Sequence, residues 1–132
     1  MWARACTLRF LSIIRGMARI GGYLNPEEHR EFGDYSSSLC VTGSALVALL
    51  IARELRVKRL KDLVDQFRAG ARVGIRKRIS SPVLPNSLRD TFEDHAKTVG
   101  LSLDQAASIL FRAELAERWL DRALCGTKPE SD

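Results

Sequence analysis

The feature that most constrains this chain is a weak internal repeat with an offset of sixty residues. Shifting the sequence by that offset aligns identical residues at several places. The identical pairs are Leu24 and Leu84, Phe32 and Phe92, Asp34 and Asp94, Leu50 and Leu110, Glu54 and Glu114, Leu55 and Leu115, and Leu60 and Leu120. Each copy also has the pattern of a strand, a helix, a turn and a second helix. The repeat therefore predicts one small unit that is fused to its own partner.

The length and composition bound the fold class. A chain of 132 residues with 45% hydrophobic content can bury the core of one domain. Its cysteines, Cys6, Cys40 and Cys125, lie far apart and lack metal-ligand spacing, which indicates reduced thiols in a cytosolic protein. The apolar runs are too short to span a bilayer. We therefore expect no membrane role.

The sequence contains no pattern that is typical of an enzyme. It has no nucleophile beside a base, no metal-ligand cluster and no glycine-rich phosphate loop. The two histidines, His29 and His95, lie in charged surroundings, and we expect both to be exposed helix residues. We therefore predict a non-enzymatic protein without a cofactor or a metal ion.

The two ends of the chain differ from the rest. Residues 1–22 contain four arginines and no acid, and a smoother sequence begins at Met17. Transit peptides and basic arms share this pattern. We expect residues 1–16 to be an N-terminal arm or an extension from an upstream start, and residues 125–132 to be a disordered tail.

The second copy has clear start and stop signals. Residues 72–84 are rich in β-branched residues and end among prolines, which favours an extended path. A helix should begin at Pro85 or Asn86 and end near Gly100, which supplies a left-handed stop. Ser102 is a good cap for a second, longer helix.

The first copy follows the same plan. Asn25 and Pro26 are a strong helix start, and a long helix should begin at residues 42–44. The two long helices are the segments apolar enough to pack against each other. We expect them to meet around Leu49, Leu50, Ile109 and Leu110.

The stretch between the copies is strongly basic. Residues 53–78 carry a net charge of +7, whereas the whole chain carries +5. Leu60, Leu63, Val64 and Phe67 give the stretch an amphipathic helical pattern. Its basic side chains are either a solvated face of a linker or an electrostatic footprint for phosphates.

The second copy resembles a known family. The stretch from Leu84-Pro85-Asn86 through Gly100 to Leu101-Ser102 is similar to the ribbon-helix-helix fold of the Arc, MetJ and CopG repressors. The resemblance implies a mainly α fold in which one strand from each unit pairs into a two-stranded antiparallel β-ribbon. Here both units lie in one chain, so we expect a single-chain pseudodimer from an internal duplication. The units should span 17–55 and 75–124, joined by a basic helical linker at 56–74.

The resemblance also implies a DNA-binding surface, because the ribbon in that family lies in the major groove. On the first strand Arg19, Gly21 and Tyr23 should face outward. Anchoring the second strand on Leu84 places Lys77, Ile79, Ser81 and Val83 on the outer face, whereas the opposite parity exposes Arg76, Arg78 and Ser80. The expected base-reading residues are Arg19, Gly21, Tyr23, Lys77 and Ser81. The expected phosphate-binding residues are Thr42, Gly43, Ser44, Arg76, Arg78, Ser102 and Leu103.

The tandem arrangement is similar to that of the TraY and MobC kinds of relaxosome accessory protein. This implies a cytoplasmic bacterial protein that binds double-stranded DNA as a plasmid-transfer factor or as a transcriptional repressor. The expected form is a monomeric pseudodimer, with self-association on DNA left open. A second hypothesis is a degenerate protein-interaction module that docks a relaxase, a coupling protein or a toxin.

Overall fold

The computed structural model describes residues 17–67 and 75–125 of the chain. The predictions for the arm at 1–16, for part of the linker and for the tail beyond Cys125 lie outside these residues. The described chain is mainly helical with a small antiparallel β-sheet component, as expected. Its helices are α2 (Pro26–Ser38), α3 (Gly43–Val57), α4 (Leu60–Phe67), α5 (Asn86–Lys97), α6 (Leu103–Glu117) and α7 (Trp119–Cys125).

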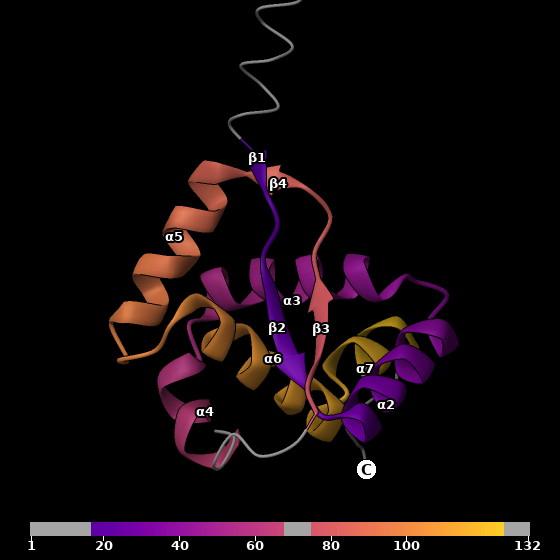
Figure 1. Ribbon diagram of the computed structural model, residues 1–132. Helices are drawn as coiled ribbons and strands as arrows, with labels where there is room; N and C mark the ends of the chain where they lie inside the picture. The colour runs from indigo at the N-terminus through magenta and orange to yellow at the C-terminus, as the bar shows by residue number, and fades with distance from the viewer. Residues whose placement is uncertain (1–16, 68–74, 126–132) are drawn as a thin grey trace, which may run out of the picture.

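The strands come from distant parts of the chain and form one interrupted ribbon (Figure 1). Strand β2 (Gly21–Leu24) pairs antiparallel with β3 (Lys77–Ser80), and β1 (Met17–Ala18) pairs antiparallel with β4 (Leu84–Pro85). The predicted antiparallel pairing of these two regions is therefore confirmed.

A bulge separates the two ladders. Two residues follow Ala18 before β2 begins, but three residues, Ser81 to Val83, separate β3 from β4. Ser81 bridges the gap, because its N–H donates to the Ile20 carbonyl at 2.7 Å and its Oγ accepts from the Ile20 N–H at 3.0 Å. Pro82, which has no N–H, lies in this unpaired part of the ribbon. The extra residue shifts the in-and-out alternation of side chains from one ladder to the next.

The predicted caps hold the starts of the helices. Asn25 accepts a hydrogen bond from the Glu28 N–H at 2.7 Å, and the Glu28 carboxylate accepts one from the Asn25 N–H, which is a capping box. Thr42 caps α3, and Ser102 caps α6. Gly100 adopts the predicted left-handed conformation, with φ of 75°.

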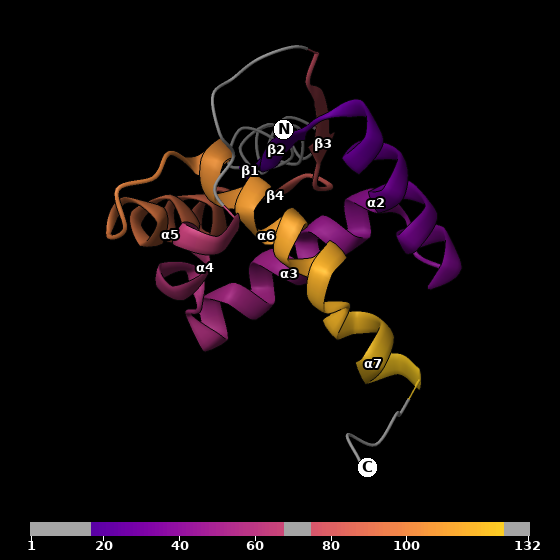
Figure 2. The same ribbon diagram turned by 90° about the horizontal axis from the view of Figure 1, so that it is seen from below.

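The long helices α3 and α6 cross behind the ribbon, and α2 and α5 lie on its opposite flanks (Figure 1). Seen from below, the ribbon and α7 lie on opposite sides of this crossing (Figure 2). Leu50, Ile109 and Leu110 are buried at the crossing, as predicted. The prediction for Leu49 is wrong, because its side chain is 41% exposed. The buried residues of α3 are Leu46, Val47, Leu50, Ile51 and Glu54, a helical face that excludes position 49.

The basic stretch between the copies contains α4, which packs against α6. Leu60 and Leu63 are buried there, so the apolar face of this helix belongs to the core.

Two buried carboxylates connect the halves of the molecule. Glu114 accepts a hydrogen bond from the Tyr35 hydroxyl at 2.6 Å and one from the Leu120 N–H at 2.8 Å. Burial and the Glu114 carboxylate raise the pKa of Tyr35 above its usual value. Each contact joins α6 to another helix, so the hydroxyl and carboxylate hold α2, α6 and α7 together.

The second carboxylate, Glu54, occupies the position sixty residues earlier and has a parallel set of contacts. It accepts a hydrogen bond from the Leu60 N–H at 2.7 Å, and Nε2 of His95 lies 2.7 Å from its Oε2. The expectation that His95 is an exposed residue is wrong, because this ring pairs with Glu54 and its side chain is only 15% exposed.

We predict that Leu110→Ala lowers the free energy of unfolding by about 2 to 5 kcal/mol, because it leaves a cavity at the helix crossing. The matched control is Leu49→Ala, which truncates an exposed leucine and should cost less than about 1 kcal/mol. Urea denaturation measures both. Equal losses for the two variants would contradict the described packing of α3 on α6.

We also predict that Tyr35→Phe costs about 1 to 3 kcal/mol of stability, because it removes a hydrogen bond to the buried Glu114 carboxylate. The hydroxyl also accepts a 3.1 Å hydrogen bond from the Asp121 N–H. Tyr23→Phe is the control, since the hydroxyl of Tyr23 has only a 3.5 Å contact with Arg78. A thermal melt in which both variants behave alike would show that the Tyr35 contact contributes little.

Candidate nucleic-acid interface

The inner face of the ribbon is seated directly on α6. Gly22 is buried there, and a Cβ atom added to it would lie 2.8 Å from the backbone nitrogen of Ser108. The next residue, Tyr23, donates its N–H to Oγ of Ser108 at 2.8 Å. Leu24 is fully buried, and Ile79 on the other strand packs against the core. A glycine at position 22 therefore lets the strand approach the helix closely enough for this hydrogen bond.

The outer face of the ribbon is cationic and contains one aromatic ring. Tyr23 lies opposite Arg78 in the ladder, so the two side chains share a face. The guanidinium carbon of Arg78 lies 5.6 Å from the centre of the Tyr23 ring, and that of Arg76 lies 4.8 Å from it. These distances are within the range of cation–π contacts.

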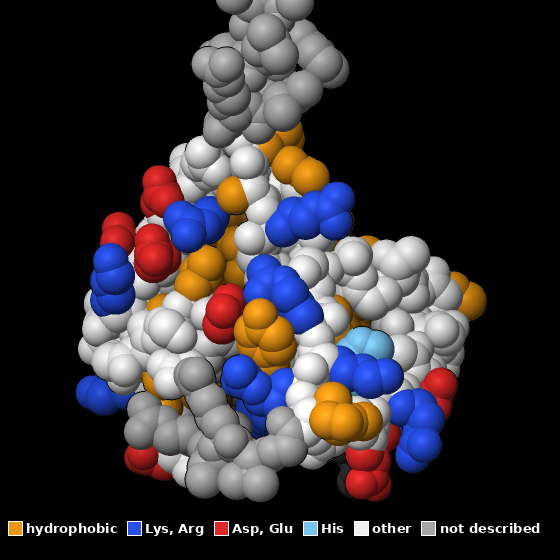
Figure 3. Space-filling model, viewed as in Figure 1, with side chains coloured by type: hydrophobic (Ala, Val, Ile, Leu, Met, Phe, Trp, Pro, Cys, Tyr) orange, Lys and Arg blue, Asp and Glu red, His pale blue; other side chains and the backbone are white. Residues whose placement is uncertain are grey.

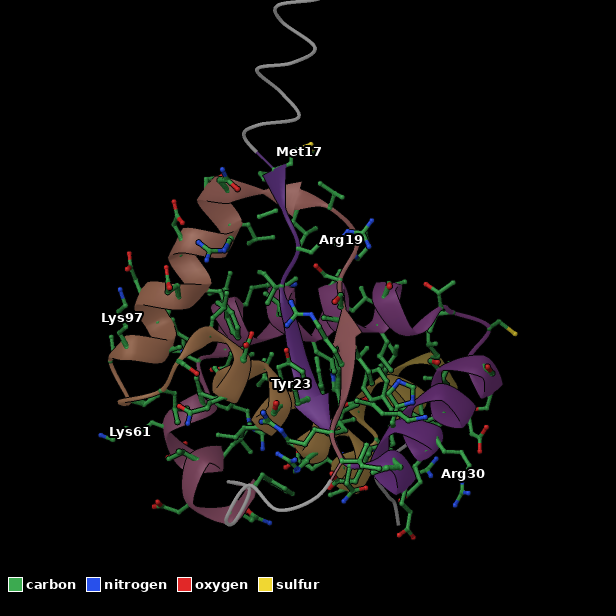
Figure 4. The ribbon with its side chains drawn as sticks, in the orientation of Figure 1. Met17, Arg19, Tyr23, Arg30, Lys61 and Lys97 are labelled. Atoms are coloured by element: carbon green, nitrogen blue, oxygen red, sulfur yellow. The ribbon has the colours of Figure 1, made fainter. Side chains whose placement is uncertain are left out.

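The basic side chains follow the ribbon across this face of the molecule (Figure 3). Tyr23 lies on β2 in the middle of the face, and Arg19, between β1 and β2, lies higher, beside the connection from β3 to β4 (Figure 4). Arg19, Arg76, Lys77 and Arg78 are all exposed. The face therefore presents several positively charged hydrogen-bond donors along a narrow, two-stranded element.

The structure resolves the parity of the second strand. Arg78 and Ser80 lie opposite Tyr23 and Gly21 on the outer face, so the alternative parity is the one observed. The prediction that Ser81 faces outward is wrong, because its side chain is fully buried at the bulge. Anchoring the pattern on Leu84 failed because the extra residue of the bulge changes the alternation between β3 and β4.

Two other predicted residues are placed less directly. Lys77 is exposed, although it pairs with the buried Leu24 at the end of β3. In the alternation of the strand it therefore belongs to the inner face of the ribbon. Gly21 lies on the outer face and is nevertheless buried. A Cβ atom at position 21 would lie 2.9 Å from the guanidinium carbon of Arg78, so that side chain covers it.

The starts of α3 and α6 lie on opposite sides of the ribbon (Figure 1). At α3, Thr42 caps the Ala45 N–H, and no acid is present in the first turn. The amides of Gly43 and Ser44, in that turn, have no acceptor within the helix. This end can therefore attract an anion.

The start of α6 is less favourable for an anion. Ser102 and Gln105 satisfy each other's backbone N–H groups in a capping box, at 3.0 and 3.2 Å. Asp104 follows Leu103 in the first turn and adds a negative charge. The two helix starts that were predicted as equivalent phosphate-binding sites therefore differ in charge.

Two residues of this region were not predicted. Ser108 fixes the ribbon on α6, and Asp104 lies 3.7 Å from a guanidinium nitrogen of Arg78. A serine or an aspartate inside an amphipathic helix has no pattern that distinguishes such a role from ordinary solvation.

Among residues 17–67 and 75–125, no group of three or more His, Cys, Asp or Glu could hold a metal ion. A small pocket lies between the C-terminal parts of α3 and α6, and no ribbon residue lines it. In the same ranges no single helix is long and apolar enough to cross a membrane, and only α2 with α3, bent by 90°, reaches the required length and composition as a pair.

No family model, curated protein or solved structure matches this chain at a significant level.

We predict that Gly22→Ala destabilises the protein by about 1 to 3 kcal/mol, because the new methyl group would collide with the backbone of α6. Gly33→Ala is the matched control. A Cβ atom there meets nothing within 4 Å, and alanine should stabilise the interior of α2 by about 0.5 to 1 kcal/mol. Urea denaturation compares the two. A tolerated Gly22→Ala would show that β2 does not rest on α6 as described.

Proposed function

We propose that this chain is a DNA-binding protein that inserts its β-ribbon into the major groove. The observation that carries the proposal is the outer face of the ribbon, where Arg76 and Arg78 lie against the ring of the half-buried Tyr23 and Arg19 is exposed further along the ribbon. A two-stranded ribbon is narrow enough to enter the major groove of B-DNA. Its outward side chains would then meet base edges, and cationic side chains at its ends would meet phosphates.

The residues of the proposed interface differ in the DNA groups that they can bind. An arginine can donate two parallel hydrogen bonds to O6 and N7 of guanine, which is the commonest specific contact in the major groove. Arg19, Arg76 and Arg78 are the arginines of the ribbon face that are able to do so. The start of α3 lies beside the ribbon, where its amides would receive a phosphate.

We further propose that the chain is a pseudodimer of two ribbon-helix-helix units derived from an internal duplication. The helix starts support this, because α5 and α6 begin sixty residues after α2 and α3. The buried carboxylates support it too, since Glu54 and Glu114 have the same sixty-residue spacing, as do their partners Tyr35 and His95. One unit cannot bury its own apolar face, and fusion makes the pairing independent of concentration.

The proposed units are unequal, so the DNA site should be asymmetric. The ribbon end at β2 and β3 presents Tyr23 with Arg76 and Arg78. The other end, towards β1 and β4, presents the exposed side chains of Arg19 and Val83. The first end should specify bases and the second should tolerate several.

Such a protein would act in the bacterial cytoplasm without chemistry of its own. Its role would be that of an accessory factor at an origin of plasmid transfer or that of a transcriptional repressor. The alternative is a protein-interaction module that docks a relaxase, coupling protein or toxin. The exposed apolar side chains of Ile75, 74% exposed, and Val83, 44% exposed, near the two ends of the ribbon favour this second candidate.

The test is a mobility-shift titration with duplex DNA over a series of salt concentrations. Replacing Arg76, Lys77 and Arg78 with alanine should weaken binding. It should also flatten the slope of log affinity against log salt by about 1 for each phosphate that the variant no longer neutralises. The reason is that each neutralised phosphate releases a condensed counterion.

The matched control replaces Arg30, Lys61 and Lys97, which removes the same charge from exposed positions at the edges of the view, away from the ribbon (Figure 4). This variant should retain most of the salt slope. Equal slopes for the two variants would mean that the ribbon is no special site for DNA. No shift with any duplex would instead favour the protein-interaction candidate.

A further inference from the structure

The guanidinium of Arg78 is folded down on its own ribbon. Its Nε donates to Oγ of Ser80 at 3.1 Å, and one terminal nitrogen lies 3.5 Å from the hydroxyl of Tyr23. The same nitrogen lies 3.7 Å from a carboxylate oxygen of Asp104 in the first turn of α6. The side chain is therefore held from β2, from β3 and from a neighbouring helix.

Gly21 leaves the space that the guanidinium of Arg78 occupies. The outer face of β2 has no side chain at this position, and a Cβ atom there would lie 2.9 Å from both the carbon and a terminal nitrogen of the guanidinium. Arg76 differs, because its one described contact is with the ring of Tyr23. The position of the Arg78 side chain is thus fixed by contacts with several residues.

We propose that this contact is autoinhibitory, with Asp104 competing with DNA for Arg78. The inference rests on the proposed function, since it concerns how the same ribbon face is regulated. In the free protein the Asp104 carboxylate stands in for the anionic or acceptor group that DNA would offer. Arg78 must leave Asp104, Ser80 and Tyr23 before it can reach a guanine or a phosphate, so the affinity for DNA falls by the strength of those contacts.

The position of Asp104 explains why the carboxylate remains beside the ribbon. An acid in the first turn of a helix is stabilised by the positive end of the helix dipole. The residue sixty positions earlier, in the first turn of α3, is Ser44, so the inhibiting charge is present on one side of the ribbon and not at the corresponding place on the other. Both Arg78 and Asp104 are more than 40% exposed, so the pair is weak enough for DNA to break.

The experiment measures the affinity of the full chain for one duplex at fixed low salt. Asp104→Asn should tighten binding by about two- to fivefold, the range expected for loss of an exposed ion pair. Asp104→Ser, which copies the residue of α3, should do the same. Asp90→Asn is the control, because it removes an exposed acid that pairs with Arg89 on α5 instead.

The Asp104→Asn substitution in an Arg78→Ala variant then tests whether Asp104 acts by holding Arg78 or only by repelling the DNA phosphates. There, Asp104→Asn should leave the affinity unchanged, since the side chain that Asp104 restrains is gone. An equal gain in both backgrounds, or an equal gain from Asp90→Asn, would overturn the inference, because Asp104 would act only through its charge. Unchanged affinity of Asp104→Asn in a chain that binds DNA would overturn it as well. If neither the original chain nor the variants bind any duplex, the proposed function fails and the inference fails with it.

Discussion

The structure depends on the pairing of two strands that lie far apart in the chain. In the described part of the chain, β2 and β3 have each other as their only strand neighbours, so this ladder forms only when the two halves of the chain meet. The ribbon is then fixed by its seat on α6, where Gly22 brings the backbone close and Ser108 receives the Tyr23 N–H. This seat buries one face and leaves the other outward. Arg78 of the outer face therefore lies on a paired strand, and Arg19 and Arg76 lie directly beside the strands.

The buried carboxylates make the two halves interdependent in a second way. Glu54 and Glu114 are almost fully buried, and a buried carboxylate is tolerated only when it is well paired. Each takes one hydrogen bond from backbone at the start of the following helix and one contact from the other half, where the partner is His95 in one case and Tyr35 in the other. Corresponding positions in the two halves thus use different chemistry, which agrees with the proposed duplication followed by divergence.

The sequence was sufficient for the broad fold but not for the parity of the second strand. The caps at Asn25, Thr42 and Ser102 are local signals, and the helices begin where these signals lie. The bulge is a property of the pairing between strands, so counting from Leu84 could not reveal that Ser81 turns inward. Burial of Ser81 removes one expected base contact and brings Arg76 and Arg78 to the outer face. The restraint on Arg78 by Asp104 depends on the packing of α6 beside the ribbon, which no spacing in the sequence indicates.

The most direct test of the proposed base reading is to let the full chain select binding sites from a random pool of duplexes. The unequal ends of the ribbon predict one enriched sequence without two-fold symmetry, in which guanines are specified under the end that carries Arg76 and Arg78. A clean palindrome would contradict the account, because it would require two chains that each contribute the same strand. A pool with no enriched sequence would contradict base reading by the ribbon altogether.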